Sequence, residues 1–402
     1  MKQNTTYKQT ELGLIPEDWE LKKLGKVGEI DKKSLNSNTD KEYEFDYISL
    51  SDVDSDQFSI KTSKQKFKNA PSRARRIVKK GDVLLSTVRP NLEGFTIIRD
   101  EVKDLIASTG FAVITSKNEL HNEYLFNFLF SNIIKRQFHK LLVGSNYPAI
   151  NSSDVKNLKI PLPPLQEQKK IADCLSTWDV AIEKQSQLIN ALTQRKKALM
   201  QQLLTGKKRL PGFEGEWNLN SINDLFIFKN GKAHENDIDE NGKYILVNSK
   251  FISTDGEILK KTNSNLAPLE VNDLVFVMSD VPNGKALAKF FLIKEDNLYT
   301  LNQRIGLLKI KKGNPIFMYY LLNRNAYFLM FDNGVGQTNL RKDDILDCPL
   351  NIPSLSEQTA IAEILATADR ELQLQKEKLA QLQTQKKGLM QVLLTGKKRL
   401  IN

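Results

Sequence analysis

The sequence predicts an α+β fold that is built twice: two similar mixed α/β domains, each followed by a long helix, with the two helices paired as an antiparallel coiled coil. Residues 198–210 read ALMQQLLTGKKRL, and residues 388–400, 190 positions later, read GLMQVLLTGKKRL. The similarity extends backwards without a gap, since Glu167 and Gln168 match Glu357 and Gln358. A repeat of this length indicates a duplicated architecture with an internal pseudo-two-fold relation.

Four segments follow one another along the 402 residues. We expect a first domain over residues 1–160, a first long helix over 161–206, a second domain over 207–350 and a second long helix over 351–402. The globular stretches of the two domains, from about 12 to 160 and from about 212 to 350, have roughly 140 to 150 residues each, which is enough chain to bury a core.

Both globular segments contain short apolar runs that are typical of strands, followed by a helical stretch. Between these landmarks the two segments differ widely, so the sequence predicts one shared scaffold whose intervening segments differ between the two copies. The expected strands and helix are 46–50, 82–86, 111–114 and 124–138 in the first segment, and 244–247, 273–276, 305–308 and 316–329 in the second.

Each long segment carries an apolar stripe in which the spacing alternates between four and three residues over about five heptads, the pattern of a coiled-coil seam. Gln and Lys interrupt the stripe at the same two places in both copies, as Gln185 and Lys196 and as Gln375 and Lys386. These polar residues fix the register or are inherited from the duplication. The other seam positions are Ile171, Leu175, Trp178, Ile182, Ile189, Leu192, Leu199 and Leu203, and Ile361, Leu365, Ala368, Leu372, Leu379, Leu382, Leu389 and Leu393.

The ends of the long helices are marked by proline before them and by glycine after them. Pro163-Pro164 and Pro353 precede the helices, and Gly206 and Gly396 follow them, each with a basic run just beyond. A helix of about 38 residues is about 57 Å long at 1.5 Å per residue. The most economical partner for one seam is the other seam of the same chain, and pairing between two molecules is the alternative.

Charge favours a polyanionic partner, because the formal net charge is +11 and the pI is about 9.3. Nucleic acid is the first candidate and a membrane surface the second, although excess charge can also serve only solubility. We expect no membrane span, since no run of about 18 apolar residues exists, and no secretory signal at the N-terminus. Cys174 and Cys348 occupy non-equivalent positions of the repeat and indicate free thiols in a reducing cytoplasm.

The repeated motifs resemble one known family. Ile160-Pro161-Leu162-Pro163-Pro164-Leu165-Gln166-Glu167-Gln168 leads into the first long helix, and Asn351-Ile352-Pro353-Ser354-Leu355-Ser356-Glu357-Gln358 leads into the second. With the opening segments around Trp19 and Trp217, the strand motif GDVLLS at 81–86 and the LLTGKKRL endings, the chain is similar to the specificity subunit of type I restriction-modification systems.

This resemblance implies two target-recognition domains, separated by an antiparallel coiled coil, that each read one half of a bipartite duplex-DNA target. It implies two modification (methyltransferase) subunits as partners, and it allows two restriction subunits in addition. S-adenosylmethionine, ATP and Mg²⁺ would then belong to those partners, and this chain would carry no cofactor and no catalysis.

The residues themselves also indicate no catalytic or metal site. His121, His139 and His234 are scattered, with no His or Cys cluster of zinc-site spacing. No phosphate-binding loop is present, and Gly334 and Gly336 are too few for a dinucleotide fingerprint.

The clearest candidate for DNA contact in the first domain is the stretch 61–80, KTSKQKFKNAPSRARRIVKK, which holds nine Lys or Arg and no acid. Such density suits phosphate neutralisation, and Arg can also bind guanine through two hydrogen bonds. The alternatives are a solvated basic loop, an ion pair of Arg89 with Glu93, and plain turn chemistry at 145–147. The candidates are Lys64, Lys66, Arg73, Arg75, Arg76, Arg89, Ser145, Asn146 and Tyr147.

The second domain is less basic and richer in amides, which can pair with adenine in the major groove. The segment around Gln337 aligns with the segment around Tyr147 at the offset of the repeat, which supports both as binding loops. Its candidates are Lys260, Lys261, Ser279, Asn283, Lys285, Asn302, Gln303, Arg304, Gln337, Asn339 and Arg341.

If the helices pair, they would act as a ruler that sets the spacing of the two half-sites, with centres near one helical turn of DNA, about 10 base pairs, apart. Other interpretations remain open: a coiled-coil DNA-binding adaptor without a methyltransferase, a methyltransferase or nuclease fragment, and a scaffold whose basicity serves RNA or solubility. The bases recognised do not follow from the sequence.

Overall fold

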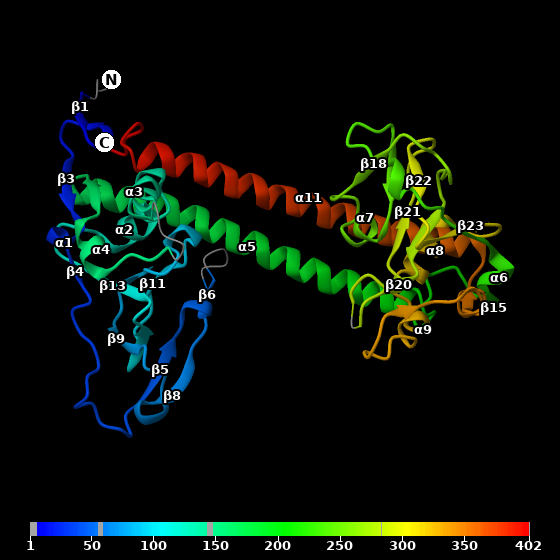
Figure 1. Cartoon of the computed structure of the whole chain (residues 1–402), viewed down its shortest axis with the longest axis horizontal. Coiled ribbons are helices and arrows are strands. Elements are labelled where there is room, and N and C mark those ends of the chain that lie inside the picture. The colour runs from blue at the N-terminus through cyan, green and yellow to red at the C-terminus, as the bar shows by residue number, and fades with distance from the viewer. Residues whose placement is uncertain (1–5, 55–58, 143–147, 283, 402) are drawn as a thin grey trace. The chain divides into compact units, whose positions relative to one another are not determined.

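The computed structural model describes residues 6–54, 59–142, 148–282 and 284–401. The chain divides into two compact units, a first unit of residues 1–187 with 377–402 and a second unit of residues 188–376 (Figure 1). Each unit therefore contains one globular domain, one half of the first long helix and the opposite half of the second.

Two four-stranded sheets form the centre of the first unit within its described residues, in the orders β11-β10-β13-β4 and β8-β5-β12-β9. All neighbours in these sheets are antiparallel except β5 and β12. The strands are β1 (Tyr7–Thr10), β2 (Gly13–Pro16), β3 (Glu20–Lys23), β4 (Gly28–Ile30), β5 (Glu44–Ile48), β6 (Val53–Asp54), β7 (Ser59–Ile60), β8 (Ser63–Lys66), β9 (Ala74–Val78), β10 (Val83–Ser86), β11 (Phe95–Ile97), β12 (Leu105–Ser108), β13 (Phe111–Ser116) and β14 (Lys159–Leu162).

The helical stretch that was expected over 124–138 is two helices, so the prediction of a single helix is wrong. The chain turns between Phe128 and Asn132, where the Ser131 hydroxyl accepts a hydrogen bond from the N–H of Ile134 at 3.4 Å and so begins a new helix. A short polar side chain at such a position competes with the helical backbone. The helices are α1 (Leu24–Val27), α2 (Asn122–Phe128), α3 (Asn132–Leu142) and α4 (Ser152–Asn157), with the short 3-10 turns η1 (Leu50–Asp52), η2 (Phe67–Asn69) and η3 (Pro90–Leu92).

The second unit repeats this frame with shorter strands. Its described residues form the sheets β16-β23-β19-β21 and β18-β17-β22, and β17 and β22 are parallel as β5 and β12 are. The strands are β15 (Asn218–Ser221), β16 (Phe226–Asn230), β17 (Tyr244–Val247), β18 (Lys260–Thr262), β19 (Leu274–Val277), β20 (Ser279–Asp280), β21 (Phe290–Leu292), β22 (Tyr299–Leu301), β23 (Ile305–Ile310), β24 (Thr338–Asn339) and β25 (Pro349–Ile352).

The helix expected over 316–329 is again interrupted, and that prediction is also wrong in detail. Arg324 adopts a left-handed backbone with φ 57°, and the Asn325 side chain then accepts the N–H of Tyr327 at 3.0 Å to begin the next helix. The helices are α6 (Ile222–Leu225), α7 (Ser249–Ser253), α8 (Pro315–Leu322), α9 (Ala326–Leu329) and α10 (Lys342–Leu346), with the 3-10 turn η4 (Glu235–Asp237).

The two long helices are α5 (Leu165–Leu203) and α11 (Leu355–Leu393), each of 39 residues. Both end shortly before a glycine with φ 68°, Gly206 or Gly396, as the C-cap pattern predicts. The backbone hydrogen bonds of each helix lie within the helix, so its apolar side chains can pack against a neighbouring helix.

The helices pack antiparallel, as predicted, and they do so within one chain. In the first unit Ile171 and Leu175 of α5 share a core with Leu393 of α11. In the second unit the opposite halves meet, since Leu203 shares a core with Ile361 and Leu365. Every described seam residue of both helices is buried or half-buried.

The lysines that interrupt the seam have partners on the opposite helix. Lys386 forms an ion pair with Asp179 in the first unit, and Lys196 forms one with Asp369 in the second. Because lysine and aspartate can meet only in one alignment of the two helices, these paired interruptions fix the register. Burial raises the pKa of the Asp179 carboxyl, and the adjacent Lys386 opposes that rise.

A duplicated ion pair joins the start of each long helix to the segment after the end of the other. Glu167, which is 2 % exposed, accepts two hydrogen bonds of 2.7 Å from Arg399, and Glu357 accepts two of 2.7 Å from Arg209. The neighbouring glutamines, Gln168 and Gln358, accept backbone N–H groups of the globular domain at 2.8 and 2.9 Å. The Glu-Gln motif and the arginine of the basic run therefore anchor each helix to its domain.

Candidate nucleic-acid interface

Two of the predicted contacts of the first unit, Arg73 and Arg89, lie at one end of strands β10 and β13, which we name the loop end of the first unit (residues 71–73, 87–94, 109–110 and 148–149). The backbone N–H of Thr109 donates to the Arg73 carbonyl at 2.8 Å, and that of Thr87 donates to Gly110 at 2.8 Å. The N–H of Arg89 donates to the Pro148 carbonyl at 2.7 Å. Arg73 and Arg89, both exposed, are thereby placed on adjoining loops.

Three further candidates of this unit, Ser145, Asn146 and Tyr147, lie outside the described residues. Ala149, two residues after them, forms a bridge with Val88 in the loop that carries Arg89.

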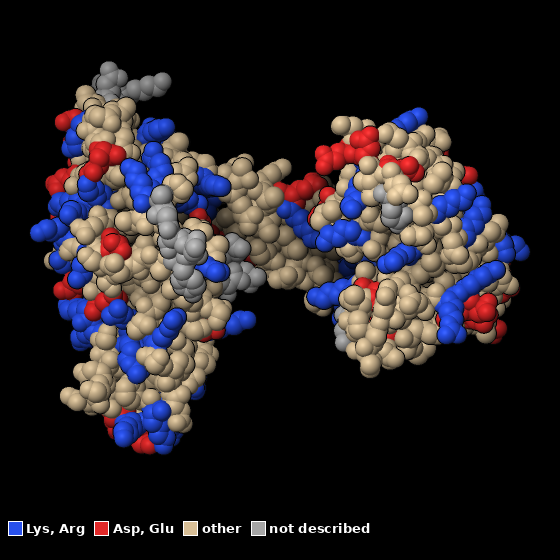
Figure 2. Space-filling view, viewed as in Figure 1, with Lys and Arg blue, Asp and Glu red and all other residues tan. Residues whose placement is uncertain are grey.

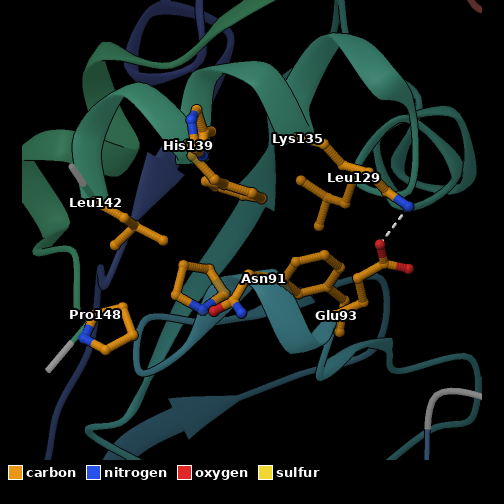
Figure 3. A pocket seen from close by; sticks show the side chains of 10 residues that line it. Asn91, Glu93, Leu129, Lys135, His139, Leu142 and Pro148 are labelled. Atoms are coloured by element: carbon orange, nitrogen blue, oxygen red, sulfur yellow. Dashed lines mark ion pairs between the residues drawn. The ribbon is translucent and has the colours of Figure 1, made fainter. Parts of the chain in front are cut away.

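Arg89 has a left-handed backbone with φ 50°, which costs a residue with a Cβ of the order of 1 kcal/mol and suggests a functional constraint. Glu93, the acid of the same loop, forms an ion pair with Lys135 of α3 (Figure 3). This ion pair links the end of the loop that carries Arg89 to helix α3.

Next to this loop is a pocket of about 370 Å³, enclosed by the loop on one side and by helix α3 on the other (Figure 3). Its walls are mainly apolar, from Phe95, Leu129 and Phe138, with the Glu93–Lys135 pair at the edge. The arrangement can hold an apolar group, and it offers no cluster of metal ligands.

The basic stretch 61–80 is more structural than its composition indicates. Lys64 and Lys66 lie on β8 and are paired with Asp46 at 3.0 Å and Glu44 at 3.1 Å. The guanidinium of Arg75 lies 4.9 Å from the ring centre of Phe67. On the face drawn in Figure 2, Lys and Arg side chains of both units lie among acidic ones.

Arg76 is bound internally, which disfavours it as a base contact. Its guanidinium lies 3.1 Å from the carboxylate of Asp31, whose side chain is only 7 % exposed. That carboxylate also accepts the N–H of Val113 at 2.9 Å and the hydroxyl of Ser152 at 2.5 Å. Arg76 therefore completes a buried polar network between the two sheets.

In the second unit the corresponding loop end comprises residues 278–280, 302–304 and 337–340. The short strands β20 and β24 pair Ser279 with Asn339, and the Gln337 amide donates to the Ser279 hydroxyl at 2.7 Å. The turn with Asn302, Gln303 and Arg304 precedes Ile305, which pairs with Val277 just before β20.

The two loop ends have the same backbone frame. The N–H of Ile150 donates to Thr87 at 2.9 Å in the first unit, and the N–H of Leu340 donates to Met278 at 2.8 Å in the second. The bridge between Val88 and Ala149 corresponds to the pair of Ser279 with Asn339. Equivalent positions therefore carry different side chains on an equivalent scaffold.

The remaining candidates of the second unit are not gathered at the loop end. Lys260 and Lys261 lie on β18, an edge strand of its sheet, and Arg341 begins α10, where its N–H donates to Asp344 at 2.9 Å. Lys285 is exposed in the loop before β21, and Asn283 lies outside the described residues.

Sequence reasoning missed Lys232, which is exposed and lies against the 302–304 turn. Its N–H donates to the Leu301 carbonyl at 3.0 Å, and it forms a bridge with Asn302. The only local signal was Gly231, where a Cβ would lie 2.1 Å from the Asn302 carbonyl oxygen and prevent this close approach.

Other chemistry is sparse in the part of the chain that the structure describes. No group of three or more His, Cys, Asp or Glu side chains is placed to hold a metal ion, and no described helix is long and apolar enough to cross a membrane. Burial raises the pKa of the Cys348 thiol to about 12, which leaves that thiol protonated and unreactive at neutral pH.

The chain belongs to the family of type I restriction-modification DNA specificity domains, whose model matches twice, over residues 16–194 and 214–384. Each match contains one globular domain and most of one long helix. The repeat recognised in the sequence is therefore a repeat of the family domain itself.

Among curated relatives, the MjaVIII specificity subunit of Methanocaldococcus jannaschii is 28% identical over 96% of this chain and 95% of its own length. The HindI specificity subunit of Haemophilus influenzae is 28% identical over 45% of this chain and 40% of its own. Among solved structures, a chain from a type I restriction-modification assembly has a TM-score of 0.66 at 20% identity, covering 96% of this chain and 99% of that one. The S subunit of M. genitalium has a TM-score of 0.57 at 16% identity, covering 98% and 97%.

Proposed function

We propose that this chain is the DNA-reading subunit of a type I restriction-modification complex and that each unit reads one half of a bipartite duplex target through its loop end. The observation that carries this proposal is the equivalence of the two loop ends in backbone and their difference in side chains. Arg73 and Arg89 suit guanine and phosphate, whereas Gln337 and Asn339 suit adenine.

Methyl transfer from S-adenosylmethionine, and cleavage with ATP and Mg²⁺ where it occurs, would be supplied by partner subunits. Two modification subunits would bind this chain, and restriction subunits would join them in systems that cleave. A groove of about 530 Å³ along the helix pair of the second unit supports a docking role for the helices, because its walls combine apolar Leu192, Leu199 and Ile364 with charged Lys196 and Glu371.

The long helices would set the distance between the half-sites. Each is continuous over 39 residues, about 58 Å at 1.5 Å per residue, and the seam lysines fix the register of the pair. Inserting one helical turn in both helices is expected to change the preferred spacer and leave both half-sequences unchanged. A spacer preference that does not move would contradict this role.

Selection of duplexes from a random pool by the assembled complex, followed by sequencing, tests the main proposal. Wild type is expected to return two half-sequences with an unread spacer. Arg89→Ala is expected to relax one half and Asn339→Ala the other, each by about 1–3 kcal/mol of discrimination. Lys184→Ala, an exposed lysine on α5, is the charge-matched control and should change neither half.

Two outcomes would contradict the proposal. Loss of preference at both halves from a single loop-end substitution would show that the units do not read independently. Methyl transfer by the isolated chain would show that it carries catalytic groups of its own.

A further inference from the structure

The first unit has a basic cavity at the end of its strands opposite to the loop end. The cavity has a volume of about 350 Å³ and lies where the turn after β9, the end of β13 and the start of α5 meet. Four lysines and one acid line it, Lys79, Lys80, Lys117, Lys169 and Asp82, together with polar side chains that include Ser116 and His121.

The lysines exceed the negative charge available to them. Lys80 is paired with Glu101 at 3.1 Å, and Lys117 donates to the Lys26 carbonyl at 3.1 Å. Within the described part of the chain, the amino groups of Lys79 and Lys169 form no ion pair, and both side chains are exposed. Lys79 interacts with Asp82 and Glu29 only at longer range, and Glu29 is itself paired with Lys32. The cavity is therefore left with excess positive charge.

The acid in the lining does not neutralise this charge at close range, because its carboxylate is already bound by other groups. Asp82 accepts the Thr115 hydroxyl at 2.6 Å and the backbone N–H of Lys79 at 2.9 Å. Two atoms of the lining, Ser116 Oγ and His121 Nδ1, are buried and have no hydrogen-bond partner among the described residues. Buried polar atoms without protein partners are uncommon, and water or a polar group of a ligand can satisfy them.

The second unit provides an internal comparison, since equivalent hydrogen bonds identify which of its residues correspond to those of the cavity. The N–H groups of Lys79 and Glu270 donate to Asp82 and Asp273, each at 2.9 Å, so Glu270 stands where Lys79 does. The N–H groups of His121 and Asn314 donate to Gln168 and Gln358, so Asn314 stands where His121 does.

At this second place the charges and polar groups satisfy one another. Glu270 is paired with Lys309 at 2.6 Å, and the Asn314 amide donates to the hydroxyl of Thr359, the counterpart of Lys169, at 3.2 Å. Val271 replaces Lys80. The excess positive charge of the first unit is thus a difference between the copies and not a property of the shared fold.

We propose that this cavity binds an Asp or Glu side chain of the modification subunit and so anchors that partner to the first unit. This inference rests on the proposed function, which supplies the partner. The cavity borders Leu165 and Lys169 at the start of α5, and it lies at the far end of the strands from Arg73 and Arg89. Its position therefore favours a protein that docks on the long helices over the DNA that the loop end reads.

The test replaces two lining residues with neutral ones, Lys79→Gln with Lys169→Thr, the second being the residue of the other copy. Assembly of the full chain with purified modification subunits is titrated by size-exclusion chromatography and fluorescence anisotropy, and duplex-DNA affinity is measured alongside. Assembly is expected to weaken about tenfold, which two partly exposed ion pairs can supply, while DNA affinity changes less than twofold.

Lys170→Ala is the matched control, because it removes one charge from the adjacent helix position, which does not line the cavity, and installs the residue of the other copy, Ala360. It should leave assembly unchanged, and the reverse pair Glu270→Gln with Thr359→Lys should strengthen assembly through the second unit. Unchanged assembly of the Lys79→Gln/Lys169→Thr variant would overturn the inference and leave the proposed function intact.

A fall in DNA affinity with unchanged assembly would also overturn it, since the cavity would then hold a DNA phosphate. Failure of the wild-type chain to bind modification subunits at all would overturn both this inference and the proposed function. Retained DNA affinity in the variant serves as the measure that it is folded.

Discussion

The two units agree most closely where each domain meets the long helices and least where the strands end in loops. Glu167 with Arg399 and Glu357 with Arg209 make the same pair of 2.7 Å hydrogen bonds. At the loop ends, Arg73 and Arg89 in one unit contrast with Ser279, Gln337 and Asn339 in the other. The comparison teaches that the anchoring of the domain to the helices was retained after duplication, while the surface proposed to read DNA changed.

The two ion pairs that anchor the helices differ in how deeply their arginines are buried. Arg399 is 8 % exposed and binds Asp18 as well as Glu167, and Trp19 donates to Glu167 at 3.1 Å. Arg209 is 30 % exposed and binds the Gly215 carbonyl as its second partner. We therefore expect loss of the ion pair to lower the free energy of unfolding more in the first unit than in the second.

Removing the two glutamates is expected to have the largest effect and to show this inequality. Glu167→Ala leaves a buried guanidinium with only Asp18 and should cost about 3 kcal/mol, whereas Glu357→Ala should cost about 2 kcal/mol. Urea unfolding in a Trp178→Phe background measures it, because Trp19 and Trp217 then report one unit each. Equal losses in the two units would show that the difference in burial has no energetic consequence.

The seam ion pairs provide the next comparison. Lys386 is 10 % exposed and Lys196 is 21 % exposed, and Asp369 also accepts the Tyr320 hydroxyl at 2.5 Å. Lys386→Met should destabilise the first unit by about 2 kcal/mol because Asp179 is left without its cation, and Lys196→Met the second by about 1 kcal/mol. Thermal unfolding monitored by circular dichroism is the measurement, and adding Asp179→Leu to Lys386→Met should restore most of the loss.

Two neighbouring arginines of the first unit are expected to have different roles, Arg75 in DNA binding and Arg76 in stabilising the fold. Arg75→Ala removes the guanidinium that lies over Phe67 and should weaken DNA binding several-fold while the second half-sequence is still read as before. Arg76→Ala removes the partner of buried Asp31 and should lower stability by about 1–2 kcal/mol without altering either half-sequence. Altered preference at both halves in Arg75→Ala would contradict the independence of the units.

The smallest expected effect is a dependence on pH that the units share. Burial raises the pKa of the Asp82 carboxyl, and burial likewise raises the pKa of its counterpart Asp273. Each folded-state pKa then exceeds the unfolded value, so the folded state binds protons more tightly and the stabilisation is fully present only below the unfolded pKa of about 3.8. It is lost as pH rises through the folded pKa.

Asp82→Asn and Asp273→Asn should therefore flatten the decline in the urea midpoint that these groups cause as the pH rises above 3.8. Both carboxyls accept an equivalent backbone N–H at 2.9 Å, and Asp82 also accepts the Thr115 hydroxyl, so the two variants should change in the same direction. A steeper decline in either variant would mean that the carboxylate stabilises the fold when charged.

Much of the fold was predictable because it depends on local pattern. The four-three stripe, the prolines before the helices and Gly206 and Gly396 after them define two helices without reference to the rest of the chain. The predicted strands also lie near their places, as β5, β10 and β13 show. The interrupted helices were missed, because the turns at Ser131 and Arg324 depend on what the flanking helices pack against.

The candidate site was less predictable, because charge density says nothing about pairing. Arg76 and Lys66 counted as DNA contacts in a basic run with no acid, yet Asp31 and Glu44 lie against them from elsewhere in the sequence. Likewise, Arg209 and Arg399 read as the basic ends of helices, and folding makes them partners of buried, distant glutamates.

The sequence by itself determined that this protein is built twice, with two register-matched helices, because periodicity and repetition are properties of neighbouring residues. Only the tertiary structure decided which charges face solvent, since an ion pair depends on the meeting of residues far apart along the chain. The tertiary structure also decided that Arg73 and Arg89 share a loop end while Lys79 and Lys169 line the opposite cavity, because strand pairing fixes which loops become neighbours.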